Sequence, residues 1–96
     1  MSVYVDKLMP CIPSPKWPFR FACHLIADSI RELDGFARRL GLKREWFQQG
    51  KLLPHYDLCA SKRKLALELG AIELSLHEIG RRIQEAREQS DISSGN

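Results

Sequence analysis

The sequence lacks any apolar run that approaches the roughly 18 residues of a membrane-spanning helix. Its beginning, MSVYVD, also lacks the basic-then-apolar pattern of a secretory signal peptide, so we expect a cytoplasmic protein without a membrane partner. Cysteine is scarce as well. The chain has three, Cys11, Cys23 and Cys59, which is an odd number, and they include no Cys-x-x-Cys pair. This pattern favours reduced thiols over a disulfide framework.

Several motifs that would name a reaction are absent too. The chain contains no Walker loop, no Gly-x-Gly-x-x-Gly and no Gly-x-Ser-x-Gly. The familiar sequence patterns of NTPases, dinucleotide-binding proteins and α/β-hydrolases are therefore excluded. No internal repeat is visible.

What is present describes one small domain. The chain has 96 residues, of which 44% are hydrophobic and 28% charged, which suffices for one compact core but not for a second domain. We expect a single α/β domain over residues 1–88. Residues 89–96 offer little apolar surface to bury, and we expect them to form a disordered tail.

The net charge of +3 is unevenly distributed along the chain. Residues 31–66 hold nine basic and four acidic side chains, a local excess of +5, whereas residues 67–96 hold three basic and six acidic ones. Such an excess attracts phosphorylated ligands or nucleic acid, although ordinary solvated helix faces also carry it. The middle of the chain is therefore the first place to look for a partner.

The first half of the chain predicts two strands and a helix. Residues 3–5 and 19–27 are rich in β-branched, aromatic and apolar residues, and a proline-rich loop with Trp17 separates them over residues 8–18. His24 is the polar exception within the second strand. A capping box, Ser29-x-x-Glu32, then begins a helix that Gly41 ends.

The second half is less regular. Residues 42–58 predict a short strand or anchor at Trp46, a turn over residues 49–51 and a lead into His55. Ser61 is the expected N-cap of a helix that runs through residue 69, residues 71–74 form a brief strand, and Ser75-x-x-Glu78 opens a last helix. The element order predicts a small single-domain α/β sandwich, with a three- to four-stranded mostly parallel or mixed sheet and about three helices.

Polar side chains gather where these elements meet. Asp6 and Asp28 follow predicted strands, and ligands bind outside the carboxyl ends of strands in open α/β sheets. If Asp6, Asp28 and Asp57 meet, their oxygens suit Mg²⁺ or Mn²⁺, with His24 or His55 as a proton carrier. The catalytic candidates are therefore His24, Asp28, His55 and Asp57.

A basic helix start adds a candidate anion site. Ser61, Lys62 and Arg63 would place a hydroxyl, free amides and two cations together, which suits a phosphate. Cations are unfavourable at a helix N-terminus unless an anion or solvent compensates them. Each member also has an ordinary structural interpretation as a cap, a turn residue or a solvated charge.

Other chemistries remain open at this point. His55-x-x-x-Cys59 offers two zinc ligands, with Cys23 or His24 as a further one, but Cys23 and His24 face opposite ways on a strand. Cys59 paired with His55 could also act as a nucleophile. Finally, the polar set could bond to itself and fix the core.

Several blocks in the right order resemble a known family over about residues 3–75. They are YVD at residues 4–6, CHLIAD at 23–28 with EL at 32–33, LGL at 40–42 with Arg44 and Trp46, HYD at 55–57 with SKR at 61–63, and GAIE at 70–73. This pattern is similar to the bacterial and phage family of domain of unknown function 4031. The resemblance groups these blocks without implying an activity.

The sequence thus favours binding of a phosphorylated ligand, either a nucleotide or a nucleic-acid phosphate, with metal-assisted phosphoester chemistry. The main rival is a non-catalytic module, associated with phage, that docks a protein or nucleic acid through the proline-rich loop, Trp17, Trp46 and the basic middle of the chain.

Overall fold

The central strand of the sheet is β3 (Phe21–Ala27), whose apolar residues face both sides. The structure, a computed structural model, describes residues 2–49 and 53–94, with side chains through residue 85. Across the sheet the strand order is β4-β5-β3-β1-β6, and a further strand, β2, pairs with the beginning of β3. The strands that flank β3 are β1 (Val3–Val5), β2 (Met9–Pro10), β4 (Phe47–Gln48), β5 (His55–Leu58) and β6 (Ile72–Glu73).

The expected α/β class is confirmed, with three helices among the described residues. The described sheet has six strands rather than three or four, and of the two expected arrangements it is the mixed one, with mostly antiparallel pairs. β1, β2 and β5 all run antiparallel to β3, and β4 runs antiparallel to β5. Among the described strands only β1 and β6 are parallel. For β1, β2 and β3 the physical reason is the connection: the proline-rich loop between β2 and β3 holds no crossover helix, which adjacent parallel strands require.

The helices begin and end largely where their caps predict. α1 (Ile30–Leu40) begins after Ser29, whose hydroxyl accepts from the Glu32 amide, and it ends at Gly41 with a φ of 72°. A short 3₁₀ helix, η1 (Arg44–Trp46), precedes β4. Ser75 and Glu78 form the second capping box at the start of α3 (Leu76–Ser94). The predicted tail of residues 89–96 thus begins inside α3, and its residues 95–96 lie outside the described part.

The N-cap predicted for the middle helix is wrong by two residues. α2 (Ala60–Glu68) begins after Cys59, which makes no side-chain cap bond, so Ser61 lies within the first turn. The reason is that β5 ends at Leu58 and the chain turns into the helix at once. Of the turn predicted over residues 49–51, only Gln49 lies within the described residues.

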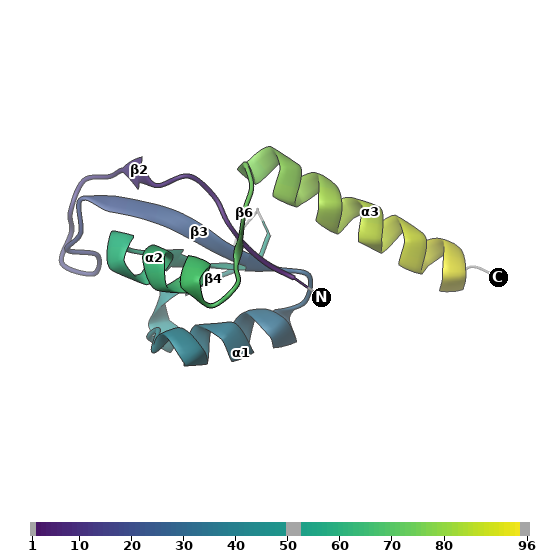
Figure 1. Cartoon of the computed structure of the whole chain (residues 1–96), viewed down its shortest axis with the longest axis horizontal. Helices are drawn as coiled ribbons and strands as arrows, with labels where there is room; N and C mark the ends of the chain where they lie inside the picture. The colour runs from purple at the N-terminus through teal and green to yellow at the C-terminus, as the bar shows by residue number, and fades with distance from the viewer. Residues whose placement is uncertain (1, 50–52, 95–96) are drawn as a thin grey trace.

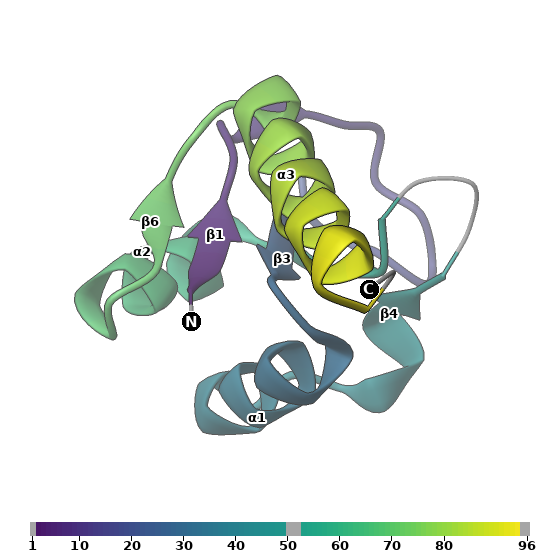
Figure 2. The same cartoon turned by 90° about the vertical axis from the view of Figure 1, so that its right-hand side faces the viewer.

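Two separate apolar layers cover the two faces of the sheet. α1 and α2 lie on one face, and α3 crosses the other, as Figures 1 and 2 show. The larger core joins Leu25 and Leu58 to Leu33 of α1 and Ala66 of α2. The smaller one packs Ile79 and Ile83 of α3 onto the sheet residues Tyr4 and Ile26.

The smaller core leaves part of its sheet face uncovered, because α3 packs at the Tyr4 and Ile26 end and then extends away from the sheet (Figure 1). In the described residues no helix has both the length and the apolar character of a membrane span. The proline-rich loop returns Trp17 to the body, where its ring meets Phe19 and Trp46 edge-on.

Candidate metal centre

A row of polar side chains crosses β5, β3 and the residue that follows β1, on the face that α3 leaves uncovered. His24 of β3 pairs directly with Asp57 of β5, and the Asp6 amide bonds to the His24 carbonyl at 3.4 Å. His55 lies two residues before Asp57 and therefore shares its face. As the alternation predicts, Cys23 faces the opposite core while His24 faces this row.

An irregularity in the sheet positions Asp6. β1 pairs with β3 in the register Val5↔Leu25, but β2 pairs with β3 in the register Met9↔Ala22. The segment that joins β1 to β2 therefore has one residue more than the stretch of β3 opposite it. This is a β-bulge, which frees backbone groups from the ladder and redirects side chains. The Asp6 carbonyl, released from β3, instead accepts from Arg63 Nε at 3.0 Å.

The Asp6 carboxylate replaces that carbonyl and holds His24 at two points. One oxygen accepts the His24 amide at 2.6 Å, and the other accepts His24 Nδ1 at 2.7 Å. Asp6 is buried, so little water competes with these bonds. Together they fix the ring orientation and keep the proton on Nδ1, which leaves Nε2 as the free ring atom.

The same contact makes His24 more basic. Its hydrogen bond to Asp6 raises the His24 pKa above the usual 6.5; partial burial opposes this, and the charges of Asp6 and Asp57 add to the rise. A carboxylate that holds Nδ1 in this way also makes Nε2 a stronger metal ligand.

His55 is oriented by a different group with the same result. Its Nδ1 donates to the Leu53 carbonyl at 2.8 Å, because a carbonyl oxygen can only accept. Its Nε2 therefore points elsewhere, 3.7 Å from an Asp57 oxygen. The His24 and His55 rings meet edge-on with their centroids 4.8 Å apart.

His24, His55 and Asp57 can each direct one ligand atom to a common point. These three atoms lie within 4.8 Å of one another. Ligands of a tetrahedral zinc ion are about 3.3 Å apart, given bonds of 2.0–2.1 Å, so modest side-chain rotation would close the set around an ion. The side chains of His24 and Asp57 are 33% and 31% exposed, which leaves the outer side of the site open.

This set revises the predicted oxygen site. Asp57 offers a ligand atom, but Asp6 is engaged with His24. Asp28 lies away from His24, His55 and Asp57. Because β1 and β3 are antiparallel, their carboxyl ends lie at opposite ends of the strands. Its carboxylate accepts the Ser2 amide and the Tyr4 hydroxyl, both at 2.9 Å. The two aspartates are separated by roughly four residues of strand, about 13 Å.

The predicted phosphate-binding trio is dispersed as well. The Lys62 ammonium donates to the Leu40 carbonyl at 2.7 Å and so caps α1. Arg63 bridges the Asp6 carbonyl and the Glu73 carboxylate. The Ser61 hydroxyl is 3.3 Å from the Cys59 sulfur. Lys62 therefore stabilises the end of α1, and Arg63 holds the backbone of Asp6, the residue that orients His24.

The cysteine alternatives gain no geometric support. Among the described residues the potential ligand set contains His24, His55 and Asp57 but neither Cys23 nor Cys59. Burial raises the pKa of Cys23 to about 12, so its thiol is protonated and inert at neutral pH.

Two supporting groups could not be read from residue types. The Leu53 carbonyl is a backbone group, and Glu73 acts only through Arg63. The one usable signal was the alternation His55-x-Asp57, which places both side chains on one face of a strand.

The comparisons with known proteins give the family and nothing further. The family model described as "Protein of unknown function (DUF4031)" matches residues 3–86, nearly the whole chain, so the chain belongs to that family. No curated protein and no solved structure shows significant similarity to it.

Proposed function

We propose that this member of the DUF4031 family binds one divalent transition-metal ion through His24, His55 and Asp57 and uses it to hydrolyse a phosphoester. One observation carries the proposal: each histidine donates Nδ1 to a fixed acceptor, and His24, His55 and Asp57 each bring one ligand atom within 4.8 Å of the other two. A carboxylate or carbonyl on the second ring nitrogen is the usual support of a metal-binding histidine.

The ligand chemistry selects the class of metal. Two imidazoles and one carboxylate suit Zn²⁺ or Mn²⁺ better than Mg²⁺, which prefers oxygen ligands. Three protein ligands with an open outer side are typical of catalytic rather than structural zinc. Of the two ions expected from the sequence, Mn²⁺ therefore remains and Mg²⁺ is disfavoured.

The chain's own groups have defined tasks in this proposal. Asp6 and the Leu53 carbonyl hold the two rings in place, and Arg63 holds Asp6. A divalent ion in such a site supplies an activated water near neutral pH and a Lewis acid for the substrate oxygen. The basic excess of residues 31–66 supports the approach of an anionic substrate.

Isothermal titration of the metal-free protein with Zn²⁺, Mn²⁺ and Mg²⁺ tests the metal site. We expect one equivalent of Zn²⁺ to bind, Mn²⁺ to bind more weakly and Mg²⁺ to bind least. His55→Gln should lower Zn²⁺ affinity at least 100-fold, because it removes a ligand. His77→Gln is the matched control, since His77 is exposed on α3 and outside the cluster. Equal losses in both variants, or no binding of any ion, would refute the site.

Hydrolysis of bis(p-nitrophenyl) phosphate by the zinc- and manganese-loaded protein tests the reaction. Turnover that disappears with chelator and in His55→Gln supports the proposal. Tight metal binding without turnover of phosphomonoesters or phosphodiesters would refute the hydrolytic part and leave a metal-binding domain.

A second candidate is the non-catalytic interaction module. The observation that favours it is a group of exposed apolar side chains around β2 and the start of β3, where Met9, Ile12 and Phe21 are 57%, 92% and 46% exposed. Trp17 and Trp46 support it less, because both are half-buried against each other. A thermal-shift screen that stays flat with every metal and phosphate compound would favour this candidate.

A further inference from the structure

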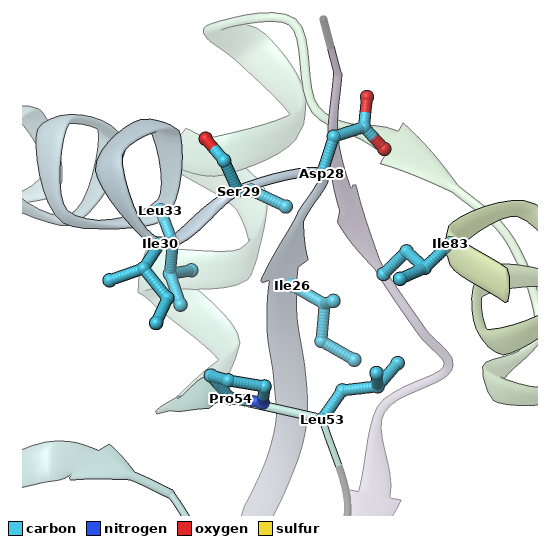
Figure 3. A pocket seen from close by; sticks show the side chains of 9 residues that line it. Ile26, Asp28, Ser29, Ile30, Leu33, Leu53, Pro54 and Ile83 are labelled. Carbon is cyan, nitrogen blue, oxygen red and sulfur yellow. The ribbon is translucent and has the colours of Figure 1, made fainter. Parts of the chain in front are cut away.

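A small cavity lies at the carboxyl end of β3, between the start of α1 and the underside of α3 (Figure 3). Its volume is about 100 Å³. Segments from four parts of the fold line it, namely Ile26 to Ile30, Leu33, the pair Leu53 and Pro54, and Ile83.

The cavity is partly open to solvent and is lined by more apolar than polar surface, the polar residues being Asp28 and Ser29. The Asp28 carboxylate is held by Ser2 and Tyr4 and points away from the cavity in Figure 3. The Ser29 hydroxyl is engaged with Glu32 at the start of α1. Because both polar side chains are already engaged, the apolar part of the lining offers water few partners and can accept a hydrocarbon group.

Part of the cavity wall belongs to the two segments that carry the proposed metal ligands, namely β3 and the residues that lead into β5. Ile26 follows His24 by two residues on the same face of β3, a spacing of roughly 7 Å. Leu53 contributes its side chain to the cavity while its carbonyl holds His55. In Figure 3 the side chains of Ile26, Leu53 and Ile83 lie close together at one side of the cavity.

We infer that the cavity is the specificity pocket of the metal centre and that it receives a compact aliphatic group whose attached oxyanion lies at the metal. The inference rests on the proposed metal site and adds the shape of its ligand. A cavity of about 150 Å³ accepts the six carbons of benzene, so about 100 Å³ corresponds to roughly four carbons, as in an isobutyl group.

Titration of the zinc-loaded protein with two ligand series tests the pocket. Alkyl phosphates and alkyl carboxylates, each with methyl, isopropyl, isobutyl and neohexyl groups, share the oxyanion but differ in its source. Affinity should rise about fourfold per methylene up to isobutyl, because each buried methylene adds a nearly constant free energy. It should fall for neohexyl. The series with the higher affinity identifies the oxyanion, whereas affinity independent of chain length in both series overturns the inference.

Two substitutions locate the effect. Ile83→Ala enlarges the cavity and should move the optimum to the longer group, whereas Ile79→Ala removes the same atoms from the same core cluster without lining the cavity. Equal shifts in both variants would contradict the inference. Ile30→Trp is the alternative if Ile83→Ala does not fold, because Ile30 is 45% exposed and its enlargement fills the cavity from the rim. It should abolish the dependence on chain length.

A metal-free arm separates this inference from the metal site itself. Binding of tert-butanol, followed by methyl NMR, should perturb Ile26, Ile30, Leu53 and Ile83 without any ion. If these methyls respond but Zn²⁺ does not bind, the proposed function fails and the cavity remains a hydrocarbon site. If Zn²⁺ binds and these methyls do not respond, the pocket inference alone fails.

Discussion

Replacing Asp6 by asparagine tests whether the carboxylate controls the ring of His24. The carboxylate accepts two hydrogen bonds, one from the His24 amide and one from His24 Nδ1. Asparagine has nearly the same shape, but its side chain offers only one accepting oxygen. If that oxygen keeps the amide, the NH₂ group faces Nδ1, and the ring must move its proton to Nε2. The ligand atom is then blocked, so we expect Zn²⁺ affinity to fall by about 10- to 100-fold.

The metal-free protein should show the same contact as a pH-dependent stability. Because Asp6 raises the His24 pKa, the folded state binds the His24 proton more tightly than the unfolded chain does. That stabilisation is fully present below the unfolded pKa of about 6.5 and is lost as pH rises through the raised folded pKa. We expect Asp6→Asn to cost about 1.5–2 kcal/mol near pH 6, at the lower end for charge-assisted bonds because His24 is one-third exposed, and less at pH 9.

Three measurements on the same samples decide the outcome. Urea unfolding between pH 5.5 and 9 gives the stability, long-range ¹⁵N NMR of the imidazole gives the tautomer, and titration with Zn²⁺ gives the affinity. Asp28→Asn is the control, because Asp28 also holds one amide and one side chain but at the other end of β1. It should lower stability without lowering Zn²⁺ affinity. An unchanged tautomer and affinity in Asp6→Asn would refute the reasoning.

Three further predictions follow from local geometry. Gly35→Ala should stabilise the protein by about 0.5–1 kcal/mol, because Gly35 is exposed inside α1 and nothing lies near the added methyl. Gly41→Ala should cost about 1–2 kcal/mol, because the φ of Gly41 is 72°. Chemical denaturation measures both changes, and equal effects would contradict the argument. Lys62→Met should cost about 1–2 kcal/mol by removing the bond to the Leu40 carbonyl, and inorganic phosphate should stabilise wild type and variant equally; a phosphate effect confined to wild type would restore Lys62 as an anion ligand. In the native protein at pH 8, a thiol reagent should modify Cys11 well before Cys23, whose pKa is about 12, and mass spectrometry showing rapid modification of Cys23 would contradict its burial.

Local chemistry made much of the fold predictable. The Ser29 and Ser75 capping boxes fix the starts of α1 and α3, and Gly41 ends α1, because each acts within a few residues of itself. The alternation that sends Cys23 and His24 to opposite faces of β3 also depends on no distant contact.

Strand direction was the part that local chemistry could not supply. Asp6 and Asp28 both follow strands, and they would meet only if those strands were parallel. After the proline-rich loop, β3 instead runs antiparallel to β1. Asp28 therefore lies at the opposite end of the strand pair from Asp6, and His24 lies beside Asp6. The sequence predicts an anion at Lys62 and Arg63 for a similar reason. Their actual acceptors are the backbone carbonyls of Leu40 and Asp6, which come from distant segments and which residue types do not reveal.

The strand order β5-β3-β1 makes the proposed metal centre depend on the pairing of three strands rather than on any one segment. Its ligands and their supports come from residues 6, 24, 53, 55 and 57, so an ion that joins them closes loops of about thirty residues and has no comparable site in the unfolded chain. An ion present at 100 times its dissociation constant would then add about 2.7 kcal/mol to the stability of the domain. For a domain with so small a core that is a substantial fraction of the total, so metal supply would govern how long the protein survives proteolysis.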